Sequence, residues 1–156
     1  MLIEQQIAER RERAAATIAK ILERPSREPW GDYRVQSASG KSYRVAMRGP
    51  GLFENYCSCP DFAVNTLGTC KHIEALLLRL SQRYGKGLER RKFARKRASI
   101  SLEYGETIRI RLRFPSDPSP DLAPALRKLA EEYFDPAGCL RPEHYRGFDR
   151  MLVQDR

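Results

Sequence analysis

Four side chains of the kinds that bind zinc stand in two tight pairs near the middle of this chain. They are Cys57, Cys59, Cys70 and His72, with ten residues between the two pairs. Side chains two residues apart point the same way in an extended segment but lie far apart around a helix. Pro60 favours extended backbone at Cys59, because a proline excludes the α region for the residue before it. The first pair therefore requires an extended segment.

The second pair lies where the sequence predicts the start of a helix. Apolar residues with helical spacing follow it, namely Ile73, Leu76, Leu77, Leu80 and Tyr84. Gly85 would end this helix. We expect Cys70 just before the helix and His72 in its first turn. The metal would then lie between the end of a hairpin and the start of a helix.

Thiolates and imidazole are the ligands that zinc prefers, and four protein ligands close a zinc site. We therefore predict one structural zinc ion and no catalysis by the metal, although both spacings are tighter than the usual Cys-x2-4-Cys and His-x3-5-His. One alternative is a redox Cys-x-Cys pair, which leaves Cys70 and His72 without a purpose. The other is a set of incidental cysteines, but closely paired thiols in a reducing compartment point to metal or redox chemistry.

The segments around the cluster predict an α+β fold. Apolar residues at helical spacing predict an N-terminal amphipathic helix over 2–24. Tyr33, Val35, Tyr43, Val45 and Met47 alternate with polar residues, which predicts a hairpin with one apolar and one arginine-bearing face. A small αβ unit should follow, with strands over 99–104 and 107–114 and a helix from 122 to 133. The expected regions are an N-terminal helix (1–25), a β-β-α zinc module (30–85), a basic linker (86–98) and the αβ unit (99–156).

The chain carries 29 basic and 20 acidic side chains, a net charge of +9. Eight basic residues against one acid, Glu89, fall between Arg83 and Arg97. Such an excess is typical of proteins that bind a polyanion such as nucleic acid; a solubilising surface is the alternative. The candidate nucleic-acid contacts are Arg34, Arg44, Arg48, Lys71, Arg83, Lys86, Arg90, Arg91, Lys92, Arg95, Lys96 and Arg97.

The segments Cys57–Phe62 and Asn65–Ala75 resemble the SWIM zinc finger, whose pattern is Cys-x-Cys, a variable gap and Cys-x-His on a β-β-α scaffold. The resemblance is to the version near the N-terminus of bacterial SWI/SNF-type helicases, and it covers about residues 33–84. It implies zinc ligation by the four residues of the cluster and binding to DNA or protein. We therefore expect a DNA-binding accessory module of such a helicase motor, with docking onto the motor or another protein partner as the alternative.

Other sequence features give no support for an enzyme. Gly40-Lys41-Ser42 lacks the earlier glycine of a phosphate-binding loop, since Val35 stands in its place. His144 is the one histidine outside the cluster, so no Ser/His/Asp arrangement is available. Cys139 and His144 are only two ligands and do not make a closed metal site, so we expect ordinary packing or surface roles for both.

Tyr56 and Phe62 flank the first ligand pair. We expect them to form a small core beneath the metal, and stacking on nucleic-acid bases is the alternative. No stretch approaches the ~18 consecutive apolar residues that cross a bilayer, and the N-terminus lacks a signal-peptide apolar segment. We expect a cytoplasmic protein with no membrane partner and no small-molecule substrate.

Overall fold

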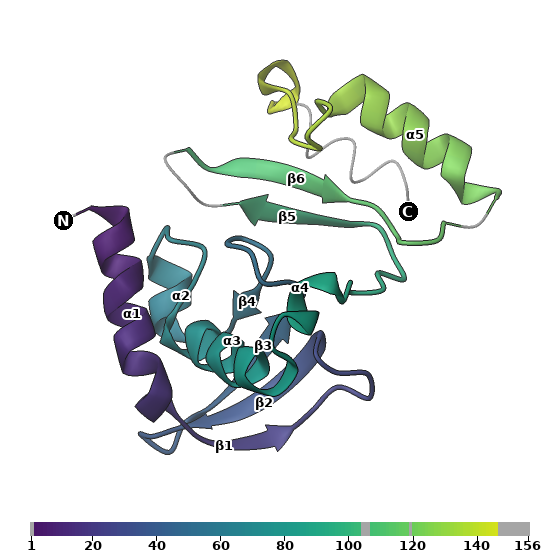
Figure 1. Cartoon of the computed structure of the whole chain (residues 1–156). Helices are drawn as coiled ribbons and strands as arrows, with labels where there is room; N and C mark the ends of the chain where they lie inside the picture. Colours follow the sequence, from purple (N-terminus) through teal and green to yellow (C-terminus); the bar gives the residue numbers. More distant parts are fainter. Residues whose placement is uncertain (1, 104–106, 119, 147–156) are drawn as a thin grey trace. The chain divides into compact units, whose positions relative to one another are not determined.

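A computed structural model shows an α+β chain and describes residues 2–103, 107–118 and 120–146 (Figure 1). The chain divides into two compact units, residues 1–93 and residues 94–156. The first holds the cysteine cluster, and each unit is described by itself. None of the helices in the described ranges has the length and apolarity that a bilayer crossing requires.

The first unit contains an antiparallel sheet of four strands in the order β1-β2-β3-β4. The strands are β1 (Ile18–Glu23), β2 (Gly31–Ser37), β3 (Ser42–Met47) and β4 (Tyr56–Cys57). The predicted hairpin is β2 and β3, in which Tyr33 pairs with Val45 and Val35 pairs with Tyr43. Gly40 in the turn has φ 84°, a conformation that glycine adopts without strain. Side chains of β2 alternate between buried and exposed, as the period of two predicts.

The N-terminal helix is shorter than the sequence predicts. Helix α1 (Ile3–Thr17) ends at Thr17, and residues 18–23 form β1, which pairs antiparallel with β2. The prediction of one helix over 2–24 extends to residue 24 because Ile18 and Ile21 continue the helical spacing of Ile3, Ile7 and Ala14, and Pro25 follows. Irregularities interrupt the pairing of β1 after Ile18 and after Ile21, and a bulge lets residues three apart share one face of a strand. The spacing was therefore compatible with both structures.

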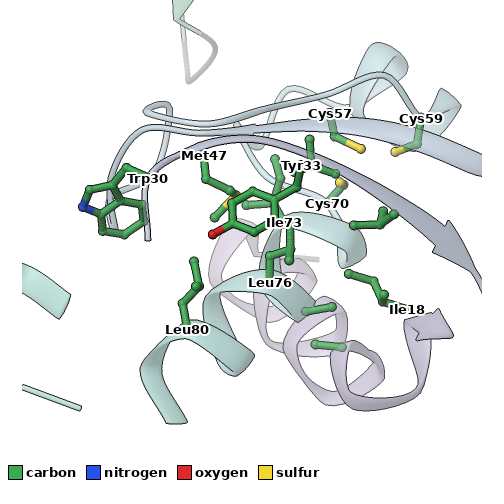
Figure 2. Close-up of a cluster of buried hydrophobic side chains, with 14 of the residues drawn as sticks. Ile18, Trp30, Tyr33, Met47, Cys57, Cys59, Cys70, Ile73, Leu76 and Leu80 are labelled. Carbon is green, nitrogen blue, oxygen red and sulfur yellow. The ribbon is translucent and has the colours of Figure 1, made fainter. Parts of the chain in front are cut away.

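Helix α3 (Lys71–Tyr84) and α1 pack against each other, and α3 supplies much of the core (Figure 1). The main buried side chains of this core are Trp30, Tyr33, Val35, Val45, Met47, Ile73, Leu76 and Leu80. Burying a side chain of this size contributes roughly 1.5–3 kcal/mol. Figure 2 shows the cysteines of the cluster at one end of this core and Trp30 at the other. The cluster is thus continuous with an apolar core.

The segment predicted as a basic linker, 86–98, is divided between the two units. It begins with a short helix, α4 (Gly87–Arg90), whose Leu88 is buried in the core of the first unit. The indole Nε1 of Trp30 donates a hydrogen bond to the carbonyl of Arg91 at 2.6 Å. This part of the basic run is therefore attached to the zinc-holding unit and is no free spacer.

The second unit pairs β5 (Ser99–Glu103) with β6 (Arg109–Arg113) and adds helix α5 (Leu122–Tyr133) and the 3-10 turn η1 (Pro142–His144). Leu112, Phe134 and Leu140 form its core. The strands β5 and β6 and the helix α5 agree with the expected αβ unit. Residues 104–106, 119 and 147–156 of this unit lie outside the described residues. Cys139 is buried, and the ring of His144 lies 4.9 Å from that of Tyr133, so both have packing roles.

Candidate metal centre

The first ligand pair lies where β4 passes into a short helix, α2 (Pro60–Val64). Cys57 pairs with Val45 in the sheet. Cys59 is extended, with φ −76° and ψ 153°, and its Sγ accepts a hydrogen bond from the backbone N–H of Phe62 at 3.4 Å. Ser58 and Arg44 exchange two hydrogen bonds, each of 3.0 Å. The sheet thus holds the loop between the two thiols.

The second pair lies at the N-terminus of α3, as the sequence predicted. Cys70 is the extended residue before the helix, with φ −151° and ψ 169°, and His72 stands in the first turn. The carbonyl of Cys70 accepts the first helical hydrogen bond, from the N–H of Glu74 at 3.0 Å. Hairpin end and helix start therefore meet at the cluster.

The four ligand atoms form one compact group. All of them lie within 4.8 Å of one another, and each side chain is at most 2% exposed. The cysteines are free thiols, and Cys57 Sγ lies 3.9 Å from His72 Nδ1. Zinc–sulfur bonds of ~2.3 Å give a tetrahedron with edges of about 3.8 Å. These distances fit a single zinc ion, so the four residues form one zinc site.

The surroundings of His72 also fit a metal. The ring is buried, it packs 4.8 Å from the ring of Tyr43, and its Nε2 has no hydrogen-bond partner among the described residues. The unprotonated nitrogen of a neutral imidazole carries a lone pair, which needs a hydrogen-bond donor or a metal ion. A zinc ion among the thiolates would bind a ring nitrogen of His72.

The three thiols perturb one another strongly in the metal-free protein. Hydrogen bonds from Cys57 and then from Cys70 lower the pKa of Cys59. The hydrogen bond to Cys59 raises the pKa of Cys57 to about 12. Hydrogen bonds of Cys70 to Cys57 and Cys59 raise the pKa of Cys70. Zinc takes the place of the protons on Cys57 and Cys70 when it binds.

Polar side chains that sequence reasoning missed hold the ligand loop in place. Asn65 Nδ2 donates to the carbonyls of Asp61 at 2.6 Å and Thr69 at 3.1 Å, and its Oδ1 accepts from the N–H of Leu67 at 2.9 Å. Gly68 has φ 70°, and a Cβ there would collide with the ring of Phe53. Gly68, two residues before Cys70, was the sequence signal that could have indicated this tight loop.

The N-terminal helix supports the same loop from outside. Arg10 binds Asp61 with its Nη2 2.8 Å from Oδ1, and Arg11 Nε donates to Glu74 Oε2 at 3.0 Å. In the sequence these arginines only interrupt an apolar stripe. In the structure they pair with acids on both sides of the ligand loop.

The aromatic residues beside the cluster differ from the expected miniature core. The rings of Tyr56 and Phe62 meet edge to face, with centroids 5.4 Å apart. Phe62 packs against the core as expected, but Tyr56 is 48% exposed. Tyr56 lies on β4 at the rim of the sheet, so solvent reaches one side of its ring.

Three of the candidate nucleic-acid contacts lie on or next to the hairpin and pair with acids. Arg34 Nε lies 3.0 Å from Glu23 Oε1. Arg44 and Arg48 share the carboxylate of Asp32, and their hydrogen bonds, against the effect of burial, lower its pKa. Much of the positive charge of this face is therefore neutralised within the chain.

The other candidate contacts fall on α3, α4 and the second unit. Lys71 is exposed in the first turn of α3, beside the ligands. Arg83 and Arg91 lie over the ring of Tyr84, with Cζ 5.4 Å and 4.8 Å from its centroid. The remaining candidate contacts of the zinc-holding unit are also exposed; they are Lys86, Arg90 and Lys92. The second unit contains Arg95, Lys96 and Arg97.

Comparison with known proteins identifies the cluster. The family model described as SWIM zinc finger matches residues 43–81, which include most of β3, all four ligands and most of α3. No curated protein and no solved structure matches the chain. The match covers about a quarter of the chain and agrees with the ligand geometry. Fingers of this family are typically non-catalytic modules that bind nucleic acid or protein.

Proposed function

We propose that this chain, in which residues 43–81 form a SWIM zinc finger, is a DNA-binding accessory module without catalytic activity of its own. The observation that carries the proposal is the exposed positive charge on the zinc-holding unit. Lys71, Lys86, Arg90 and Lys92 are all exposed there. Phosphate contacts from such side chains supply affinity with little sequence specificity.

Zinc has a structural role in this proposal. Bound by Cys57, Cys59, Cys70 and His72, it would supply a cross-link between the sheet and α3. A site with four protein ligands leaves no position for water or substrate. The residues of the basic run would then bind the polyanion from a fixed scaffold.

Association with a SWI/SNF-type helicase motor, and with it a cytoplasmic location, is the second part of the proposal. Its support is the resemblance of residues 57–75 to the finger near the N-terminus of such helicases. A purified motor of this class should bind the full chain at micromolar concentrations. Absence of binding in both low and high salt would count against this part alone.

Salt dependence tests the DNA-binding function most directly. Log affinity for duplex DNA should fall linearly with log salt, with a slope of about −0.9 per phosphate neutralised. An affinity that does not change between 50 and 200 mM salt would contradict phosphate binding. The measurement uses the full zinc-loaded chain and a fluorescent duplex.

Protein docking is a second candidate because one hollow of the first unit is largely apolar. This hollow, of about 350 Å³, lies beside α1 and α3 and includes Ala14, Pro50, Leu77 and Leu78 in its lining. Apolar docking depends little on salt, whereas phosphate contacts weaken steeply. The same titration therefore distinguishes the two candidates.

A further inference from the structure

Two arginines of the first unit share one carboxylate, that of Glu28. Arg24 Nη1 donates to Glu28 Oε1 at 2.8 Å, and Arg83 Nη1 donates to Glu28 Oε2 at 2.6 Å. The hydroxyl of Tyr84 donates to the same Oε2 at 3.1 Å. The side chain of Glu28 is only 13% exposed. Although burial opposes it, these hydrogen bonds lower the pKa of Glu28, so the carboxylate stays charged.

Two further guanidinium groups join this pair. Arg27 lines the same open hollow as Arg24 and Arg83. Arg91 lies over the ring of Tyr84, and the hydrogen bond from Trp30 to its carbonyl fixes its backbone. We call Arg24, Arg27, Arg83 and Arg91 the arginine cluster. Its members come from the end of β1, the loop after it, the last turn of α3 and the end of α4.

The charges of the arginine cluster are not balanced. Within the described residues, Glu28 is the one carboxylate that pairs with members of the arginine cluster, namely Arg24 and Arg83, which leaves the four guanidinium groups with a net charge of +3. Each guanidinium has five N–H donors, and Arg24 and Arg83 each give one of them to Glu28. Their side chains are 50% and 59% exposed, so donors remain accessible from solvent.

The arginines of the hairpin have more carboxylate partners than those of the arginine cluster. Arg44 and Arg48 share Asp32, and Arg34 has Glu23 as its own partner. Two carboxylates therefore serve three arginines there, compared with one for four in the arginine cluster. An added anion therefore meets more unpaired positive charge at the arginine cluster than at the hairpin.

We infer that the arginine cluster binds the phosphodiester backbone of a nucleic acid. This inference rests on the proposed function and assigns its principal contact site, with Arg24 and Arg27 as contacts outside the basic run. Arginine suits this ligand because its planar fork matches phosphate oxygens in pairs. Glu28 and Tyr84 hold three of the guanidinium groups before the ligand arrives, which lowers the entropy lost on binding.

The test compares two double variants of the full chain with the parent, on a fluorescent DNA duplex between 50 and 200 mM salt. Arg24→Ala/Arg27→Ala removes two members of the arginine cluster. Arg13→Ala/Lys41→Ala removes the same charge from exposed positions elsewhere. If Arg24 and Arg27 each neutralise a phosphate, the slope becomes shallower by about 1.8. The affinity of the first variant then falls about twelvefold less than that of the parent across this range, and the control keeps the parent slope.

Folding is checked by zinc content and thermal unfolding of each variant. Arg27→Glu serves as an independent variant, since Arg27 is exposed, and it should weaken binding more than Arg13→Glu. Equal slopes for both double variants on a parent that binds DNA would overturn the arginine cluster while the proposed function stands. A parent without salt-dependent binding would overturn both. Preference of the parent for poly-glutamate over DNA, lost in Arg24→Ala/Arg27→Ala, would assign the cluster to an acidic protein and overturn the inference.

Discussion

Arg11 Nε lies 3.0 Å from Glu74 Oε2 and joins the N-terminal helix to the helix that carries a zinc ligand. Glu74 is 5% exposed, and its Oε1 accepts a hydrogen bond from the hydroxyl of Thr69 at 2.6 Å. Thr69 directly precedes Cys70. The support of the metal centre thus includes α1, which lies outside residues 43–81.

Replacing Glu74 should therefore destabilise the first unit more than replacing its partner. Glu74→Ala leaves the buried hydroxyl of Thr69 without its acceptor, at a cost of about 1–3 kcal/mol. Arg11→Ala should cost about 1 kcal/mol or less, because the arginine is 64% exposed. Urea unfolding of the zinc-loaded chain measures both values. Arg13→Ala is the control and should lie within about 0.5 kcal/mol of the parent; equal costs for Glu74→Ala and Arg11→Ala would contradict this account.

The zinc site could be predicted from the sequence because local backbone determines it. Extended backbone at Cys57 and Cys59, and a helix start after Cys70, follow from residues within a few positions of each ligand. The supporting pairs could not be predicted in this way. Arg10 and Asp61 are 51 positions apart in the sequence, and only the packing of α1 brings them together.

The strand β1 shows the same limit for the fold. Ile18 and Ile21 have the spacing of a helix, and helix period alone gave no reason to end α1 at Thr17. The structure ends it there because β2 offers an edge with which residues 18–23 pair. Tertiary pairing therefore overrides the local pattern, whereas in β2 and β3 the local period of two and the pairing agree.

We predict one tightly bound zinc per chain, held by three sulfurs at ~2.3 Å and one imidazole nitrogen at ~2.0–2.1 Å. Elemental analysis gives the stoichiometry, and X-ray absorption gives the ligand types and distances. Cys70→Ser should lose most of the zinc, whereas Cys139→Ser should keep it. A four-sulfur signature, or zinc retained at full occupancy by Cys70→Ser, would contradict the ligand set.

Removing the metal should open the segment from residue 33 to residue 84. Structural zinc contributes ~10–16 kcal/mol in finger peptides, comparable to the ~5–15 kcal/mol net stability of a whole domain. The three thiols and the imidazole are buried, so zinc removal leaves polar groups inside the core. Hydrogen exchange before and after complete chelation tests this. Slow exchange that persists across 33–84 would mean that the apolar core alone maintains this segment.

Zinc affinity should rise with pH near neutrality. In the metal-free protein the raised pKa values keep Cys57, with its pKa of about 12, and Cys70 protonated, whereas the lowered pKa keeps Cys59 as thiolate. Binding then releases about two protons, and affinity should fall roughly hundredfold for each pH unit lost. Calorimetry in buffers of different ionisation enthalpy counts these protons. Release of three would mean that Cys59 is also protonated before zinc binds.

The basic run itself should contribute several phosphate contacts. Replacing Arg90, Arg91 and Lys92 by alanine should weaken binding to every DNA sequence and make the salt slope shallower by up to about three units of 0.9. Folding should persist, because Leu88 anchors α4 and the bond from Trp30 goes to the backbone carbonyl of residue 91. Zinc content and thermal unfolding verify this. If the triple variant binds DNA like the parent at all salt concentrations, residues 90–92 are only a solvated surface and the phosphate contacts lie elsewhere on the chain.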